Sequence, residues 1–389
     1  MNDHSKVSFC VSGAGPIGLA LALGLGQAGF KVTLLDQKER IDPKILLDDR
    51  RMLALSHRTV AFFKRLGVWD QLSMHATPID AVHVSQKHCK VEVLMKAKSH
   101  DIDHFGFLVP QGRIILALYE HVMQMAEITI AFATSIVPSS GLADGDVILK
   151  HQGQTRTEHF DWLIAAEGVN SVLRQHFGIE TFIRDYDQMA IIARAKFEKK
   201  HQNIAYERFT QEGPLALLPV NEQEMAVVLI TDRKERDRWQ RASDLTYAAE
   251  VLSRIGARLG DITAVSERQI WPLTLMVPKK VVEGRLLLAG NSAHGLHPIA
   301  GQGLNLGIRD CEAIVDLFTQ NHHPNAHDLA AFNAVRHKDI IKAVGATDFL
   351  VNAFGIEGQA AQTARSLGLL GVKLLPFVKK KIATVGMGY

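Results

Sequence analysis

The stretch VSFCVSGAGPIGLALALGLGQAGFKVTLLD, residues 7–36, decides how the fold begins. The apolar run Val7–Ser12 predicts a buried strand, and Pro16–Ala28 predicts a helix. Lys31–Leu35 predicts the next strand, and Asp36 follows it directly. A strand, a helix and a second strand in this order indicate an α/β fold with a parallel sheet.

The turn between the first strand and the helix has the pattern G-x-G-x-x-G. Gly13 permits the turn, Gly15 leaves room for a pyrophosphate, and Gly18 lets the helix pack closely on the sheet. Asp36 stands where a carboxylate can accept a hydrogen bond from a ribose hydroxyl. The region therefore predicts dinucleotide binding, and this motif alone leaves NAD and FAD both open.

The same region carries no charged residue from Val7 to Phe30, which imitates a membrane span or a signal peptide. Six glycines and Pro16 within Val11–Phe30 are a poor pattern for a continuous apolar helix. We therefore expect a strand, a glycine turn and a helix rather than a membrane-spanning or removable segment.

Composition limits the remaining possibilities. A chain of 389 residues suggests two or three domains, and 47% apolar with 22% charged residues is ordinary for a globular protein. A net charge of +3 argues against nucleic-acid binding as the main activity. Cys10, Cys89 and Cys311 lie far apart without a C-x-x-C pair, so they predict no disulfide framework and no metal site, and favour a reducing compartment.

Farther along, the strand candidates become short. Ile128–Val137, Val147–Gln152 and Trp162–Ala166 predict a meander of strands. Residues from about Asp185 to Leu275 contain further short strands, which indicates a second, mainly antiparallel domain inserted into the first. Beyond Asn333 the chain reads as mostly helical.

A second glycine-rich constellation follows the apolar run Leu286–Ala289. The sequence GNSAHGLHPIAGQGLNLG, residues 290–307, predicts a strand, a long loop and then a helix. Such a loop places backbone N–H groups and a helix N-terminus against a flat polar ring. In a flavin enzyme, that helix dipole would stabilise negative charge on the reduced ring.

With these residues in view, the chain resembles the class A flavoprotein aromatic hydroxylases. Their motif G-D-A-A-H-x-x-x-P-x-x-G-Q-G-x-N matches residues 290–305, and their motif D-G-x-x-S-x-x-R matches residues 167–174. Within this family, ERFTQEGPLALLP at residues 207–219 is most similar to the ubiquinone-biosynthesis hydroxylase branch, of the 2-polyprenyl-6-methoxyphenol hydroxylase type. The resemblance covers nearly the whole chain.

The resemblance implies a Rossmann-like FAD-binding domain with an inserted, mainly antiparallel β substrate domain and C-terminal helices. We expect residues 1–75, 102–180 and 280–325 to form the FAD-binding domain. Residues 76–101 and 181–279 would form the substrate domain, and residues 326–389 a C-terminal helical region.

The resemblance also assigns site residues. Those expected to bind FAD are Gly13, Gly15, Gly18, Asp36, Arg51, Gln111, Asn291, Pro298, Gly301, Gln302, Gly303, Leu304 and Asn305. Arg113 is an alternative to Gln111 for reaching the ribityl chain. Glu167, Leu217 and Pro219 are expected on the substrate and nicotinamide side.

Two residues depart from the family pattern. Asn291 replaces an aspartate that would bind a ribityl hydroxyl, and its amide oxygen can still accept a hydrogen bond. Some ubiquinone-pathway hydroxylases carry asparagine there. Glu167 replaces the aspartate of the middle motif, and its extra methylene displaces the carboxylate by roughly a bond length.

Four further residues carry open alternatives. His294 and His297 flank the flavin loop and are candidate catalytic proton carriers, although loop histidines more commonly bind backbone. Glu207 and Arg208 form either a functional pair or a solvated cross-strand ion pair.

The function implied by the resemblance is FAD-dependent hydroxylation of a polyprenylated phenol in ubiquinone biosynthesis. NAD(P)H would reduce the flavin, O2 would give a C4a-hydroperoxide, and its distal oxygen would pass to the ring. Beyond Gly29, where the first helix has ended, no further G-x-G-x-x-G occurs, so the nicotinamide would visit transiently. The alternatives are another FAD enzyme of this scaffold, such as a soluble-phenol hydroxylase, and a non-catalytic flavin-binding subunit of a lipid-pathway assembly.

The C-terminal segment suggests where the protein works. No acidic residue follows Glu357, whereas five basic residues alternate with apolar ones: Arg365, Lys373, Lys379, Lys380 and Lys381. This pattern fits either a packed terminal helix or a surface that meets anionic lipid or a partner. We expect a cytoplasmic protein with weak association to the inner membrane face or to a ubiquinone-biosynthesis complex.

Overall fold

The computed structural model describes residues 7–49, 51–87, 89, 91–296, 301–355, 384, 387 and 388. Its opening is the expected unit of β1 (Ser8–Ser12), α1 (Pro16–Gln27) and β2 (Lys31–Leu35). Gly24 and Gly26 let α1 lie close to its neighbours, because a Cβ on either would come within 3 Å of Val315 or Ile128.

The first sheet is parallel except at one edge. Its order is β19–β20–β12–β1–β2–β8, and only β19 runs antiparallel to its neighbour. The added strands are β8 (Ile128–Ala131), β12 (Trp162–Ala165), β19 (Val282–Glu283) and β20 (Leu286–Leu288). Ser12, Ala165 and Leu288 align across three strands, so the carboxyl ends of β1, β12 and β20 share one edge.

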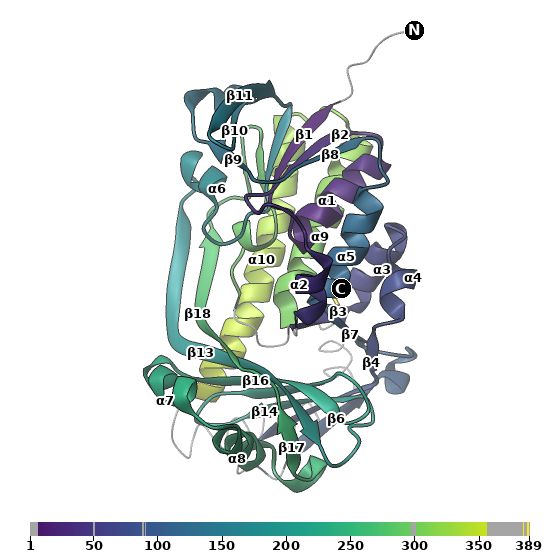
Figure 1. Ribbon diagram of the computed structural model, residues 1–389, viewed down its shortest axis with the longest axis vertical. Coiled ribbons are helices and arrows are strands. Elements are labelled where there is room, and N and C mark those ends of the chain that lie inside the picture. Colours follow the sequence, from purple (N-terminus) through teal and green to yellow (C-terminus); the bar gives the residue numbers. More distant parts are fainter. Residues whose placement is uncertain are drawn as a thin grey trace.

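Helices cover this sheet and surround its carboxyl edge (Figure 1). They are α2 (Pro43–Asp48), α3 (His57–Arg65), α4 (Trp69–Ser73), α5 (Gln111–Val122), α6 (Val172–His176), α9 (Gln302–Gln320) and α10 (Ala326–Gly355), with short 3-10 turns η2 (Ser140–Asp144) and η5 (Gly290–Ser292). A further 3-10 turn, η1 (Ala97–His100), follows a strand of the large sheet described below. Among the described residues, no helix is both long enough and apolar enough to cross a membrane.

Two small antiparallel sheets flank the parallel one. The first contains β9 (Thr134–Val137), β10 (Asp146–His151) and β11 (Gln154–His159), and the second contains β3 (Met52–Ser56), β7 (Gly106–Pro110) and β4 (Thr77–Ile79). The single strand predicted over Ile128–Val137 is wrong, because the chain turns at Ala133, where φ is +51°. β8 joins the parallel sheet and β9 joins the first small one, so the predicted meander is confirmed only for the smaller sheet.

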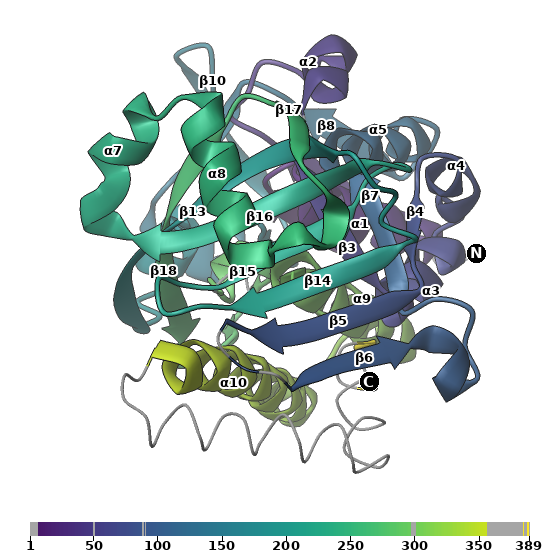
Figure 2. The ribbon, with the colours of Figure 1, turned by 90° about the horizontal axis from the view of Figure 1, so that it is seen from below.

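The largest sheet is mainly antiparallel and lies at the other end of the molecule (Figures 1 and 2). Its order is β17–β13–β16–β15–β14–β5–β6, and β18 also pairs with β13. The strands are β5 (Ala81–Gln86), β6 (Glu92–Lys96), β13 (Thr181–Phe197), β14 (Ile204–Phe209), β15 (Leu215–Pro219), β16 (Glu224–Asp232), β17 (Ile262–Val265) and β18 (Gln269–Pro278). The expected class, α/β with an added antiparallel sheet, is confirmed.

One face of this large sheet packs against helices. α7 (Arg236–Arg241) and α8 (Asp244–Ile255), with the 3-10 turns η3 (Arg233–Glu235) and η4 (Ala257–Leu259), cover it in Figure 2. Trp239 and Tyr247 form the centre of this second core, together with Leu217 and Val227 from the sheet. The opposite face of the sheet therefore looks toward the parallel sheet and its helices.

Candidate functional site

The three sequence motifs meet at the carboxyl ends of β1, β12 and β20. The side chain of Ile17, at the start of α1, touches the backbone positions of both Gly290 and Gly307. Ser292 exchanges hydrogen bonds with Gly168, its Oγ lying 3.1 Å from the amide nitrogen and 3.2 Å from the carbonyl oxygen. Ligands of open parallel sheets bind at this edge, so the convergence defines a candidate ligand site.

The first glycine turn has the geometry that the motif predicts. Gly13 has φ of +108°, and a Cβ there would lie 2.5 Å from the Ala166 carbonyl oxygen. A Cβ on Gly18 would collide with the Gly13 carbonyl oxygen. A Cβ on Gly15, by contrast, would meet no protein atom within 4 Å. Gly15 thus faces open space at the N-terminus of α1, where backbone N–H groups favour a phosphate.

Asp36 lies beside this turn. Its Oδ2 accepts a hydrogen bond from the Ala14 amide at 2.8 Å, and its Oδ1 accepts one from the Lys38 amide at 2.8 Å. A carboxylate has further lone pairs available, so these bonds orient the group without preventing contact with a ribose. The structure therefore brings Asp36 to the glycine turn, as the sequence predicted.

Arg51 and Gln111 also lie together. The Gln111 amide, at the start of α5, donates to the Arg51 carbonyl at 2.9 Å. The Arg51 guanidinium is paired with Asp49 at 2.7 Å and is 40% exposed, which leaves part of it open to a ligand. Burial alone would raise the pKa of Asp49, but the hydrogen bonds from Arg51 hold that pKa below its usual value.

The start of α9 is the second glycine-rich part of the site. Gly301 caps the helix with φ of +60°, and a Cβ on Gly303 would meet no atom of the described residues within 4 Å. Gln302 and Leu304 follow as partly exposed residues of the first turn. Gly303 thus faces open space, whereas a Cβ on Gly301 would lie 3.3 Å from the Ala54 Cβ.

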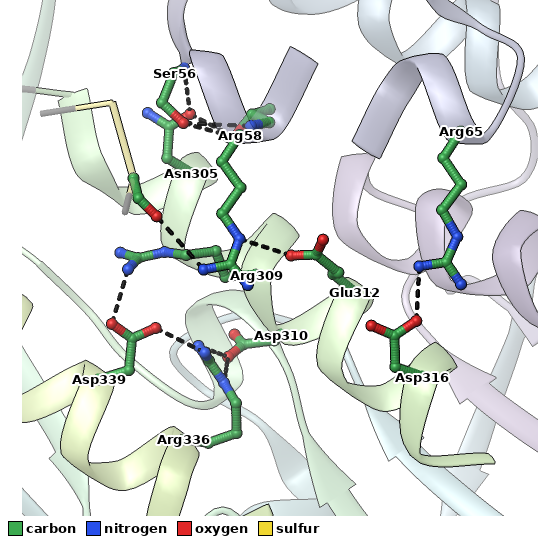
Figure 3. A network of polar contacts seen from close by, with 12 residues as sticks. Ser56, Arg58, Arg65, Asn305, Arg309, Asp310, Glu312, Asp316, Arg336 and Asp339 are labelled. Atoms are coloured by element: carbon green, nitrogen blue, oxygen red, sulfur yellow. Dashed lines mark hydrogen bonds and ion pairs between the residues drawn. The ribbon is translucent and has the colours of Figure 1, made fainter. Parts of the chain in front are cut away.

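Asn305 has a different role from the one expected. Its Oδ1 accepts from the Ser56 amide at 2.8 Å and from the Thr59 hydroxyl at 2.7 Å. Its Nδ2 donates to the carbonyl oxygens of Ala54 and Gly301. The side chain is buried and fully engaged with protein, so Asn305 holds β3 against the start of α9 instead of reaching a cofactor (Figure 3).

Asn291 and Glu167, the two departures from the family pattern, occupy contrasting positions. Asn291 is exposed at the edge of the site, where its amide is free to meet a ligand. The Glu167 carboxylate accepts from the hydroxyls of Ser12 and Ser171 and from the Leu173 amide, all within 2.9 Å. The expectation that Glu167 faces the substrate or nicotinamide is therefore corrected, because its carboxylate ties β1 to α6.

A buried ionic network binds the start of the second glycine-rich loop to helices α9 and α10 (Figure 3). Asp310 of α9 accepts hydrogen bonds from the Gly290 amide at 2.9 Å and from His294 Nε2 at 2.8 Å. Its other oxygen accepts two from the Arg336 guanidinium of α10, the shorter at 2.6 Å. Burial alone would raise the pKa of Asp310, but the neighbouring His294 and Arg336 lower it.

This network decides the role of His294. Its side chain is completely buried and bound to Asp310, so it anchors the loop and does not face a substrate. The catalytic assignment of His294 is corrected on this ground. His297 and Pro298 lie outside the described residues. The network could have been suspected from the sequence, because Asp310 interrupts the apolar helix face of Ile308, Cys311 and Ile314.

Leu217 and Pro219 do not lie on the substrate side. Leu217 is buried in the core with Trp239 and Tyr247, beneath the helices. Pro219 pairs with Met225, which belongs to the same core. Both assignments are corrected, because strand alternation turns these side chains away from the flavin-binding elements and presents Ala216 and Leu218 instead.

Comparison with known proteins now identifies the class. A family described as FAD binding domain matches residues 6–327, which is most of the chain. This protein therefore belongs to that family, and its cofactor is FAD. The resemblance stated from the three motifs is confirmed.

Individual relatives agree with this class. The chain is 28% identical to ubiquinone hydroxylase UbiM of Neisseria meningitidis serogroup C / serotype 2a, over 98% of this chain and 84% of that protein. It is 27% identical to ubiquinone hydroxylase UbiL of Rhodospirillum rubrum, over 97% and 89%. The solved structure of p-nitrophenol 4-monooxygenase PnpA from Pseudomonas putida DLL-E4 has a TM-score of 0.78 and 17% identity, with 98% of each chain covered, and thus shares the fold.

Proposed function

We propose that this protein is an FAD-dependent monooxygenase that hydroxylates a polyprenylated phenol in ubiquinone biosynthesis, with NAD(P)H and O2 as cosubstrates. The observation that carries the proposal is the meeting of three sequence motifs, two of them glycine-rich, at one edge of a parallel sheet. The names of the ubiquinone hydroxylases from Neisseria and Rhodospirillum support the substrate class.

The residues of this chain divide the binding of FAD among them. The Gly13–Gly18 turn and the N-terminus of α1 would hold the pyrophosphate, and Asp36 would accept from a ribose hydroxyl. Gly301 and Gly303 would lie against the ring, with Arg51 and Gln111 beside it. The open space at Gly15 and Gly303 fits this assignment, since a side chain at either position would occupy ligand volume.

When bound, FAD supplies the electron transfer from NAD(P)H and the activation of O2. The chain itself must position the phenol and keep water away from the reacting atoms. The large sheet suits this task, because its face toward the flavin-binding elements is mainly aliphatic. We therefore retain the proposed division into an FAD-binding part, a substrate part and a C-terminal region, with the boundaries given above.

Turnover by the purified protein tests the function. NAD(P)H oxidation should be slow with FAD alone and should accelerate when a prenylated phenol is added, with a hydroxylated product appearing. Acceleration by a soluble phenol but by no prenylated one would favour a different hydroxylase. Bound flavin that no phenol brings to turnover would favour the assembly subunit.

The membrane association is a separate proposal. It rests on the basic and apolar sequence that follows Glu357, which lies outside the described residues. Each lysine near an anionic surface contributes about 1 kcal/mol to binding. Flotation with anionic liposomes should therefore fall when Lys379, Lys380 and Lys381 are changed together to glutamine. Equal flotation of both proteins would assign substrate delivery to a partner.

A further inference from the structure

One row of side chains crosses the large sheet on the face opposite α7 and α8. The strand pairing aligns Ile192, Val228, Ala216, Glu207 and Val84 on five neighbouring strands. We call these five residues the floor row. Because neighbouring strands lie about 4.8 Å apart, the row spans about 19 Å.

Contacts on both sides of the sheet establish which way the floor row faces. Tyr206 and Arg208, the neighbours of Glu207 along β14, belong to the helix side: Tyr206 packs in the core with Trp239, and Arg208 donates to the Arg254 carbonyl of α8. Strand alternation turns Glu207 the other way.

The other face is the flavin side. Arg194 lies two residues beyond Ile192 on β13, and its guanidinium reaches the Met52 sulfur of β3 at 3.2 Å. β3 is in turn bound to the start of α9 through Asn305. The floor row and the glycine-rich start of α9 therefore share one side of the sheet.

The floor row is only partly covered by protein, since Ile192 and Val228 pack beside Ile230 and Val84 packs beside Val93. All five of its residues keep part of their surface accessible, whereas the residues on the opposite face of the same strands are buried, as Ile191, Val227, Leu217, Tyr206 and His83 show. At its Ile192 end the row borders a pocket that Arg51 and Arg194 also line, which is the flavin side of the sheet.

Glu207 is the one polar member of the floor row. Among the described residues it has no hydrogen-bond or ion-pair partner, and burial raises its pKa to about 8. Charged groups on this side of the sheet include Arg194, the Arg51–Asp49 pair and the Asp80–His104 pair. Arg194 stands three strands away, about 14 Å across the sheet, which is too far for an ion pair.

We propose that Glu207 is a catalytic residue that accepts the hydroxyl hydrogen of the substrate phenol while the aliphatic floor row supports the ring and its apolar chain. This inference rests on the proposed function. A half-buried polar group without a protein partner is costly, and a phenol would supply the missing one. The expected substrate therefore has one hydroxyl on an otherwise apolar body.

The proton balance is simple. As the ring takes up oxygen at carbon, the phenol O–H proton moves to a Glu207 oxygen and the O–H electron pair becomes a ring carbonyl. The hydrogen on the hydroxylated carbon then leaves as a proton to solvent. The ring carbonyl takes its proton back from Glu207, which restores both the aromatic phenol and the carboxylate.

The test compares Glu207→Gln with Glu222→Gln, a control at an exposed glutamate in the turn between β15 and β16. The probe is 2-geranylphenol, and the readouts are flavin content, NAD(P)H oxidation without phenol, and product formed per NAD(P)H between pH 6.5 and 9. Glu222→Gln should match wild type in all three readouts, whereas Glu207→Gln should keep its flavin and lose about 100-fold in product formation. Wild type and the control should form more product as the pH rises through about 8, and Glu207→Gln should lose this rise.

Glu207→Asp keeps a carboxyl group and should retain the pH dependence at a lower rate, which separates loss of the acceptor from loss of packing. Equal product formation and equal pH profiles in wild type and Glu207→Gln would overturn the inference. Absence of product from wild type itself, with every phenol, would instead overturn the proposed function.

Discussion

Replacing Asp310 with alanine should destabilise the protein by about 3–5 kcal/mol. Asp310 is buried and receives four hydrogen bonds, two of them from the Arg336 guanidinium. Removing one member of a buried ion pair typically costs about 3–5 kcal/mol, because the remaining charge is left without its partner. Arg336 keeps a second partner in Asp339 at 2.7 Å, which limits the loss.

The same helix offers a matched control. Asp316 of α9 pairs with Arg65 at 2.6 Å, but both side chains are more than 40% exposed (Figure 3). An exposed pair of this kind contributes at most about 1 kcal/mol. Asp316→Ala should therefore leave stability nearly unchanged, although its ion pair is as short as that of Asp310.

Urea unfolding of the FAD-free protein, followed by circular dichroism, measures both variants. The free-energy change follows from the shift in midpoint at constant slope. The double variant Asp310→Ala with Arg336→Met should be less damaged than the sum of the single changes, by about 2 kcal/mol or more. A loss below 1 kcal/mol for Asp310→Ala, or strictly additive effects, would refute the assignment of this network as the support of the flavin loop.

Other positions give further tests. Gly15→Leu should abolish FAD binding with little change in apoprotein stability, because a Cβ there would meet no atom of the described residues within 4 Å. Gly13→Leu should lose both FAD binding and stability, since a Cβ there lies 2.5 Å from a carbonyl oxygen. Calorimetry of the apoprotein and flavin absorbance distinguish the two variants. Asn291→Asp should retain FAD, as judged by flavin content, because the side chain is exposed; loss of FAD would mean that the site requires a neutral amide. The raised pKa of Glu207 means that wild type should lose stability as the pH rises from about 4.5 to about 8, by at most about 5 kcal/mol. Glu207→Gln should remove that loss in urea titrations, and an identical pH dependence in both proteins would contradict a buried, unpaired carboxyl.

The opening of the fold was predictable because local signals agree with one another there. An uncharged apolar run, a glycine turn and a second apolar run specify β1, α1 and β2 almost to the residue. β11 was not predictable, because its sequence QTRTEH has no apolar face and depends on pairing with β10. β13 extends well before its apolar part, since Thr181–Asp185 pairs with β18 while remaining largely exposed.

The site was predictable at positions where the backbone geometry requires glycine. It was less predictable at positions whose role depends on which way a side chain points and what it binds. Gly13, Gly15 and Gly303 have the environments that their motifs imply. Leu217 was assigned to the wrong face because the run LALLP is apolar on both faces of the strand. Only the register with β16 shows which face meets the helices. His294 was assigned to catalysis because its partner Asp310 lies sixteen residues away, on a helix that folds back beneath the loop.

The central claim is that this chain transfers oxygen from O2 to a prenylated phenol. The most direct measurement is mass spectrometry of the product formed by the FAD-loaded protein from 2-geranylphenol and NAD(P)H under ¹⁸O₂. The account predicts one new ring hydroxyl that carries a single ¹⁸O atom, and no incorporation when ¹⁸O is supplied as water. A hydroxyl derived from water, or NAD(P)H oxidation that never yields a hydroxylated phenol, would contradict it.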